Sequence, residues 1–121
     1  MSRALSRTRK ILSQNFLVDA GAVHRVVRSS GVTGDDLVVE IGPGDGVLTR
    51  RLLAASRRVL AYEKDPRYAG RLARRYAGDP RIRCYHIDIR DVRPPREPFA
   101  VVANVPFAAT TVIGRYPQQS A

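Results

Sequence analysis

Four short segments of the chain have the composition of buried strands. They lie at residues 37–41, 59–63, 81–87 and 99–103, and most are rich in valine, leucine, isoleucine and alanine. Short apolar runs with β-branched residues are typical of strands that are covered on both faces of a sheet. We therefore expect four buried strands.

The segments between these strands carry apolar residues at helical spacing. We expect helices at about 19–30, 46–56 and 65–77, because apolar side chains recur there every three or four residues. The third helix has a clear start, since Asp65 can cap it and Pro66 suits its first turn.

The order of these elements predicts a parallel sheet. Strands that alternate with helices are joined by right-handed crossovers in an α/β fold. Residues 90–98 form a charged, proline-rich connection that is too short for a well-formed helix. Residues 108–113 begin like another helix, and the glycine and proline at 114–121 break it.

A glycine-rich turn follows the first expected strand. Gly42, Gly44 and Gly46 allow positive φ and close approach of a ligand to the backbone. A dinucleotide fingerprint would need glycine where Val47 stands, and Asp45 would repel a pyrophosphate. A tight connection without a ligand is the alternative at this point.

Two acidic residues end later strands of the same sheet. Glu63 lies about twenty residues beyond the glycine turn, where a carboxylate can accept hydrogen bonds from ribose hydroxyls. Asp88 ends the third strand and can accept a hydrogen bond from an adenine amine. Surface carboxylates at strand ends are the alternative interpretation.

The charge of the chain favours an anionic partner. Its 21 basic and 11 acidic residues give a net charge of +10. Nucleic acid is the first candidate, and a merely soluble arginine-rich protein is the alternative. We expect residues 1–13 to form a basic flexible arm that could lie along a phosphate backbone.

Other classes of protein are disfavoured. The single Cys84 permits no internal disulfide, and His24 lacks partners at metal-ligand spacing, so we expect no metal. The chain has no long apolar segment and no secretory signal pattern. A cytoplasmic protein that does not contact membranes is the simplest expectation.

Four motifs together resemble one family. They are Gln14-Asn15-Phe16-Leu17, the stretch Glu40-Ile41-Gly42-Pro43-Gly44-Asp45-Gly46-Val47-Leu48-Thr49, Glu63 with Asp88, and Asn104-Val105-Pro106-Phe107. In this order and spacing, over about residues 8–113, the chain resembles the ribosomal RNA adenine N6-methyltransferases. It looks most like the macrolide-resistance enzymes that modify 23S rRNA. The small-subunit rRNA adenine dimethyltransferases are the alternative.

The resemblance implies a Rossmann-like fold that binds S-adenosyl-L-methionine. Asn15 and Leu17 would close over the cofactor, and Glu63 would bind its ribose. The implied cofactor-binding residues are Asn15, Leu17, Gly42, Gly44, Glu63, Lys64, Asp88, Ile89 and Asn104.

The resemblance also implies how a base is held. The Asn104 side chain and the Val105 carbonyl would accept the N6–H bonds of a flipped adenine of 23S rRNA. Pro106 would stiffen the turn, and Phe107 would stack on the base.

The chain departs from the family pattern at its C-terminal side. We expect residues 14–113 to be the N-terminal part of the catalytic domain, with the first four strands, and residues 114–121 to be an aberrant tail. The C-terminal helical domain of the family would be absent. Strand 99–103 would become an exposed apolar edge, the faces of the sheet would be left as an open apolar patch, and the chain would self-associate. Activity would be weak or absent, and a non-catalytic RNA-binding remnant is a second hypothesis. A dehydrogenase is a distant third, disfavoured by Val47.

Overall fold

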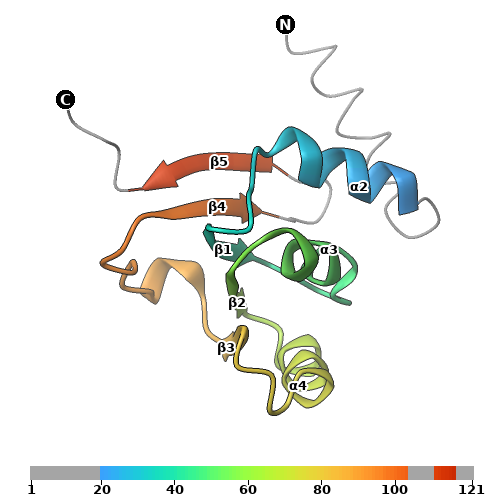
Figure 1. Ribbon diagram of the computed structural model, residues 1–121. Helices are drawn as coiled ribbons and strands as arrows, with labels where there is room; N and C mark the ends of the chain where they lie inside the picture. Colours follow the sequence, from blue (N-terminus) through green and yellow to red (C-terminus); the bar gives the residue numbers. More distant parts are fainter. Residues whose placement is uncertain (1–19, 104–110, 117–121) are drawn as a thin grey trace, which may run out of the picture.

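The computed structural model describes residues 20–103 and 111–116, which form one sheet with helices packed on it (Figure 1). In chain order the elements are α2 (Ala20–Ser29), β1 (Leu37–Ile41), α3 (Val47–Ala55), β2 (Arg58–Glu63), α4 (Pro66–Arg75), β3 (Ile82–His86), the short 3-10 helix η1 (Ile89–Asp91), β4 (Phe99–Ala103) and β5 (Thr111–Tyr116). The four expected strands and the three expected helices are therefore present, with ends shifted by a few residues at most.

The strands follow the order β3-β2-β1-β4-β5 in the sheet. β1 lies at the centre and pairs in parallel with β2 and β4, and β3 pairs in parallel with β2. This arrangement confirms the predicted α/β architecture with four parallel strands. It also places the carboxyl ends of these four strands at the same edge.

β5 was not expected from the sequence. It runs antiparallel to β4, with a register shift between Val101 and Val102. The helix expected at 108–113 is therefore wrong over its described part, because residues from Thr111 onward are in a strand. Threonine, valine, isoleucine and tyrosine all favour strands, and the open side of β4 supplies a partner.

β4 is consequently not an edge strand. It pairs with β1 on one side and with β5 on the other, so the exposed apolar edge expected at residues 99–103 is wrong. Within the part of the chain that the structure describes, β3 and β5 are the two ends of the sheet.

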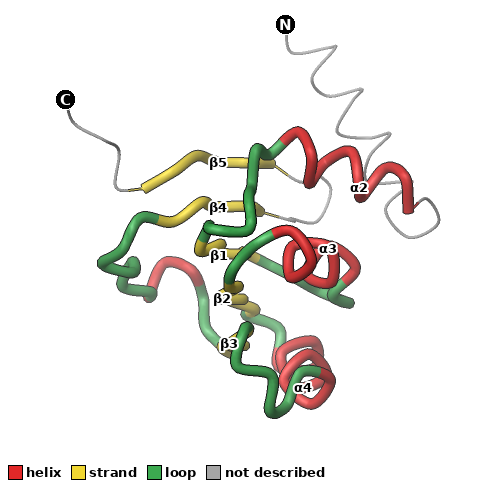
Figure 2. The backbone as a smooth tube through the Cα atoms, viewed as in Figure 1, coloured by secondary structure: helices red, strands yellow, loops and turns green. Residues whose placement is uncertain are grey.

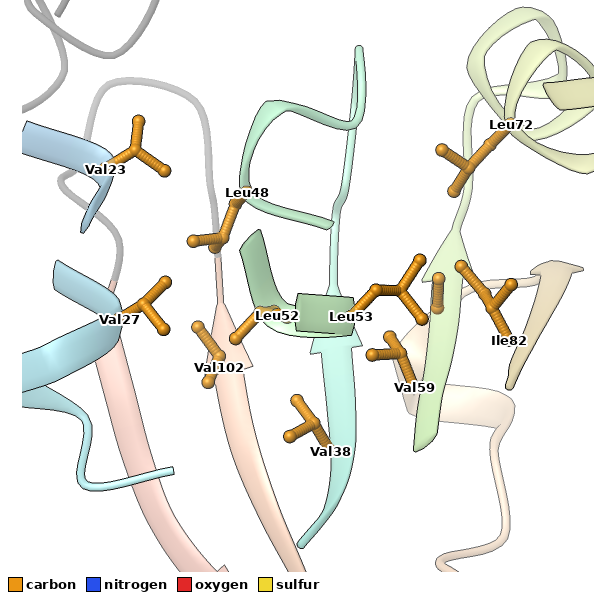
Figure 3. Close-up of a cluster of buried hydrophobic side chains, with 11 residues drawn as sticks. Val23, Val27, Val38, Leu48, Leu52, Leu53, Val59, Leu72, Ile82 and Val102 are labelled. Carbon is orange, nitrogen blue, oxygen red and sulfur yellow. The ribbon is translucent and has the colours of Figure 1, made fainter. Parts of the chain in front are cut away.

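The larger hydrophobic cluster lies between the sheet and the three helices. Figure 3 shows Val23 and Val27 of α2, Leu48 and Leu52 of α3, and Leu72 of α4 in this cluster, and each is at most 7% exposed. The i, i+4 spacing of the first two pairs places them on one face of their helix. Each fully buried side chain of this size contributes roughly 1.5–3 kcal/mol.

A second cluster occupies the opposite face of the sheet. The connection between β3 and β4 packs against this face through Ile87 and Val92, on the side away from the helices (Figure 2). Its buried members are only 3% to 8% exposed, and they are Leu37, Val39, Tyr62, Phe99 and Val101. The open apolar patch expected on the sheet is therefore not found at these residues.

The start of α4 is fixed as the sequence predicts. The Asp65 side chain accepts a hydrogen bond from the Arg67 N–H at 2.9 Å, and Pro66 occupies the first helical position. An aspartate cap and a proline at N1 both stabilise a helix N-terminus. This cap also fixes the end of β2, because only Lys64 separates Asp65 from Glu63.

Candidate functional site

The ends of the parallel strands bring the glycine turn and the two acidic residues together. Ile41 of β1 lies opposite Tyr62 of β2 and opposite Ala103 of β4, while Glu63 lies opposite His86 of β3. Ladder-type hydrogen bonds continue one residue beyond the strands, since the Gly42 N–H donates to the Tyr62 carbonyl at 2.9 Å. The turn therefore begins directly at the ligand-binding edge of an open α/β sheet.

The glycine turn has a backbone that other residues adopt only with strain. The φ angles of Gly42, Gly44 and Gly46 are 69°, 56° and 82°. All three lie in the left-handed region, where a Cβ is crowded by the following carbonyl. The sequence therefore needs glycine at each position to reverse the chain between β1 and α3.

Glu63 holds this turn from the neighbouring strand. Its Oε1 accepts a hydrogen bond from the Gly44 N–H at 2.9 Å, and its Oε2 accepts one from the Asp65 N–H at 3.0 Å. The residue is only 7% exposed. A carboxylate oxygen has two lone pairs, so each oxygen can still accept a second hydrogen bond from a ligand hydroxyl.

Asp88 is engaged by a side chain that the sequence interpretation did not consider. The Arg90 guanidinium forms a bidentate pair with the Asp88 carboxylate: Nε donates to Oδ1 at 3.1 Å and Nη2 donates to Oδ2 at 2.9 Å. These hydrogen bonds, with that from the Arg90 backbone N–H, lower the pKa of the Asp88 carboxyl to about 2. Asp88 is therefore an anion at this edge that is already paired with Arg90.

The other candidate residues near this edge are exposed or lie outside the described residues. Ile89 is 38% exposed and offers an apolar surface next to Asp88, and Lys64 is exposed. The Lys64 carbonyl lies 3.2 Å from Nε2 of His86. Asn15, Leu17 and the four residues Asn104, Val105, Pro106 and Phe107 belong to segments that the structure does not describe, although Ala103 ends β4 at the same edge.

Glu40 is a buried acid whose importance the sequence interpretation missed. It is 0% exposed, on the helix-covered face of β1, and its Oε1 accepts a 2.5 Å hydrogen bond from the Thr49 hydroxyl of α3. Its Oε2 finds no hydrogen-bond partner among the described residues. Burial is the main cause that raises the Glu40 pKa to about 8. A charged residue inside an apolar strand run was the signal for it.

A contact between α4 and the glycine turn was also missed. The Arg75 Nη1 donates a hydrogen bond to the Asp45 carbonyl at 2.8 Å. A Cβ built on Gly46 would lie 2.9 Å from this Nη1 and 2.9 Å from Cδ1 of Leu72. Gly46 is thus needed for two reasons, its positive φ and the close approach of α4.

The two kinds of glycine can be separated by substitution. Gly44→Ala should lower the free energy of unfolding by about 1–2 kcal/mol, because it meets only the left-handed strain and no atom within 4 Å. Gly46→Ala should cost about 1 kcal/mol more, since the buried Leu72 cannot move away freely. Urea unfolding of both variants measures the difference, and equal losses would contradict the packing argument.

Two other kinds of site are not found in the described ranges, 20–103 and 111–116. No group of three or more histidine, cysteine or acidic side chains could hold a metal ion there. None of the helices in these ranges has the length and apolar composition needed to cross a membrane. Cys84 is half-buried beside the larger cluster, and burial raises the pKa of its thiol.

Comparison with known proteins agrees with this geometry. The family model described as "Ribosomal RNA adenine dimethylase" matches residues 5–115. An rRNA methyltransferase of Streptomyces thermotolerans is 43% identical over 107 residues, which are 88% of this chain and 36% of that protein. The ribosomal RNA small subunit methyltransferase A of Streptomyces avermitilis is 45% identical over 108 residues, which are 84% of this chain and 37% of that protein.

A solved structure is similar in both sequence and fold. The crystal structure of the 23S rRNA methyltransferase ErmE has a TM-score of 0.67 and 39% identity, over 73% of this chain and 36% of that one. The chain therefore spans about a third of the length of these proteins. Both 23S and small-subunit enzymes are among them.

Proposed function

This chain belongs to the ribosomal RNA adenine dimethylase family, and from that premise we propose that it binds S-adenosyl-L-methionine and serves N6-methylation of an adenine in 23S rRNA. The observation that carries the cofactor half of this proposal is the position of Glu63. Its carboxylate is nearly buried at the sheet edge, where it accepts a hydrogen bond from the Gly44 N–H of the glycine turn.

The described residues fit this cofactor. The remaining lone pairs of Glu63 suit the two ribose hydroxyls, and the left-handed glycines let the methionine part approach the backbone. Asp88, with Ile89 beside it, suits the adenine ring and its amine. Asn15 and Leu17 would close the site, by resemblance to the family.

The chemistry asks little acid–base work of the protein. When bound, the cofactor supplies a sulfonium methyl group that is already activated. The protein must hold the adenine N6 in line with that methyl, and such alignment can supply roughly 7–11 kcal/mol in well-oriented cases. We assign this task to Asn104 and the Val105 carbonyl as N6–H acceptors, with Pro106 stiffening the turn and Phe107 as the stacking surface.

The choice of 23S rRNA rests on the similarity to a 23S rRNA methyltransferase of known structure. With that target, the reaction would confer macrolide–lincosamide–streptogramin resistance, as in the family that the motifs resemble. It would take place in the cytoplasm, where ribosomes are. The second candidate is dimethylation of small-subunit rRNA, favoured by the 45% identity to a small-subunit enzyme. A third is RNA binding without catalysis.

One assay separates these functions. The chain is incubated with tritiated S-adenosyl-L-methionine and, in separate reactions, with 23S and 16S rRNA transcripts, and calorimetry with S-adenosylhomocysteine is run in parallel. We expect binding of S-adenosylhomocysteine and label in 23S rRNA that is recovered as N6-methyladenosine after digestion.

Each alternative has its own outcome in this assay. Label confined to 16S rRNA would establish the small-subunit function instead. Binding of S-adenosylhomocysteine and RNA without any methyl transfer would establish RNA binding without catalysis. Absence of S-adenosylhomocysteine binding would overturn the proposal as a whole.

A further inference from the structure

A pocket on the outer side of α3 adjoins the glycine turn but is not lined by the acidic residues of the cofactor edge, which is the sheet edge that carries Glu63 and Asp88. It has a volume of about 700 Å³ and extends from the glycine turn to the end of α4. Its lining includes Arg50 and Arg51 of α3, Arg75 of α4, and Asp45 and Gly46 of the turn. The two acidic residues of the cofactor edge do not line it.

The lining of this pocket is strongly basic. All three arginines are exposed, and the ion pairs among the described residues involve other arginines. Asp45 is the one acid in the lining, so three guanidinium groups face a single carboxylate. The hydrogen bond from Arg75 to the Asp45 carbonyl holds one of these groups in place. Like charges gathered this way favour an anionic occupant.

The first turn of α3 adds to this positive potential. Gly46 caps the helix without any side-chain hydrogen bond, and the first turn contains no acidic residue. The N-terminal end of a helix carries a partial positive charge that attracts anions. Because Gly46 and Val47 also line the pocket, this helix end and the three arginines act on the same space.

We propose that this pocket binds consecutive phosphates of the RNA strand. Arginine matches a phosphate with two parallel hydrogen bonds, and three arginines on two helices suit several phosphates rather than one. The positive surface continues along α4, whose ten residues include four arginines. This inference rests on the proposed function, because it assumes that RNA is the substrate.

The test compares two variants that lose the same charge. The first carries Arg50→Gln, Arg51→Gln and Arg75→Gln. The control carries Arg83→Gln, Arg93→Gln and Arg96→Gln, which are exposed and lie in β3 or in the connection that packs on the opposite face of the sheet. A double variant, Arg50→Gln with Arg51→Gln, keeps the hydrogen bond from Arg75 to the turn. Fluorescence anisotropy with a 23S rRNA hairpin transcript is measured from 50 to 300 mM salt.

The pocket variant should bind the hairpin tenfold or more weakly at 50 mM salt, and its slope of log K against log salt should fall by roughly 2–3. The double variant should show about two-thirds of that change, and the control a clearly smaller one. Equal losses in the pocket and control variants would overturn the inference, because they would show a diffuse charge effect. A slope of log K against log salt that equals the wild-type slope in all three variants would also overturn the inference.

Two further measurements separate this inference from its premise. S-adenosylhomocysteine binding by the double variant is followed by calorimetry, and retention of it shows that the fold and the cofactor edge are intact. Binding to anionic phosphatidylglycerol vesicles is measured for the wild type and for the pocket variant. Vesicle binding that the pocket variant loses, in a chain that does not bind the hairpin, would assign the pocket to a membrane and contradict the proposal. The wild type could also fail to transfer methyl groups while hairpin binding is still lost in the pocket variant. This result would overturn the proposed enzymatic function but support the phosphate-binding pocket.

Discussion

Glu63→Ala should weaken the binding of S-adenosylhomocysteine by roughly 30- to 1,000-fold, or about 2–4 kcal/mol. The loss has two physical sources. If Glu63 binds the ribose as proposed, the ribose hydroxyls would lose two hydrogen bonds to a charged acceptor. The Gly44 and Asp65 N–H groups also lose the carboxylate that holds them at 2.9 and 3.0 Å, so the turn is less well ordered before the ligand arrives.

A double-mutant cycle separates these two sources. The ligand is changed to an analogue of S-adenosylhomocysteine that lacks both ribose hydroxyls, and the affinity is measured by calorimetry for the wild type and for Glu63→Ala. If Glu63 contacts the ribose, the analogue should bind the wild type more weakly but should lose little further affinity in the variant. Any loss that is common to both ligands then measures the effect of the turn.

The matched control for this prediction is Glu97→Ala. Glu97 is an exposed glutamate that pairs with Arg57, and it lies in the connection before β4, away from the cofactor edge. Its removal should leave the affinity for S-adenosylhomocysteine unchanged. An unchanged affinity in Glu63→Ala itself would remove this residue from the binding site.

Glu40→Gln should make the chain more stable than the wild type at alkaline pH. The pKa of Glu40 is raised from 4.5 to about 8 in the fold, chiefly because burial disfavours the charged form. Thr49 opposes this shift through its hydrogen bond, and the nearby charge of Glu63 adds to it. The folded chain therefore keeps a proton on Glu40 at neutral pH that the unfolded chain has released.

The sign of the pH dependence follows from this difference in bound protons. Between about pH 4.5 and pH 8 the native state binds one proton more at this site than the unfolded state, so stability falls as pH rises. Below this window both states are protonated, and above it both are ionised. At 1.36 kcal/mol per pH unit, the contribution changes by about 4 kcal/mol between pH 5 and pH 9.

Urea unfolding at pH 5, 7 and 9 measures this contribution. Because glutamine does not titrate, the stability of Glu40→Gln relative to the wild type should rise by about 4 kcal/mol over this range, a large part of the 5–15 kcal/mol typical of a domain. Glu97→Gln, which changes an exposed glutamate, should show no comparable trend. A difference between Glu40→Gln and the wild type that stays constant with pH would show that Glu40 is ionised in the fold.

The parallel part of the fold could be predicted because its signals are local and agree with one another. The apolar run 37–41, the glycines after it and the Asp65-Pro66 cap each specify one element and its boundary. β5 could not be predicted in this way. Its pairing with β4 depends on a register shift at Val101 and Val102, and such a contact leaves no periodic pattern in the sequence.

The candidate site was predictable in its positions and less so in its contacts. Sequence spacing located Glu63 and Asp88 at the edge, because both follow parallel strands. It could not show that Glu63 binds the glycine turn or that Arg90 engages Asp88, since these contacts depend on side-chain direction. Glu40 is recognisable in the sequence as an acid in an apolar run, but its burial depends on the packing of α3 over β1, which the sequence pattern does not specify.

The central position of β1 has a consequence for the synthesis of the chain. β1 can pair with β2 soon after both are made, but its other neighbour, β4, follows about sixty residues later, since Val38 lies opposite Ala100. At translation rates of roughly 5–20 residues per second, the second edge of β1 stays unpaired for about 3–12 s. An unpaired apolar strand edge is a template for association with other chains. The risk of association through an unpaired strand edge is therefore greatest for β1 in the growing chain, because β4 is paired on both sides in the finished sheet.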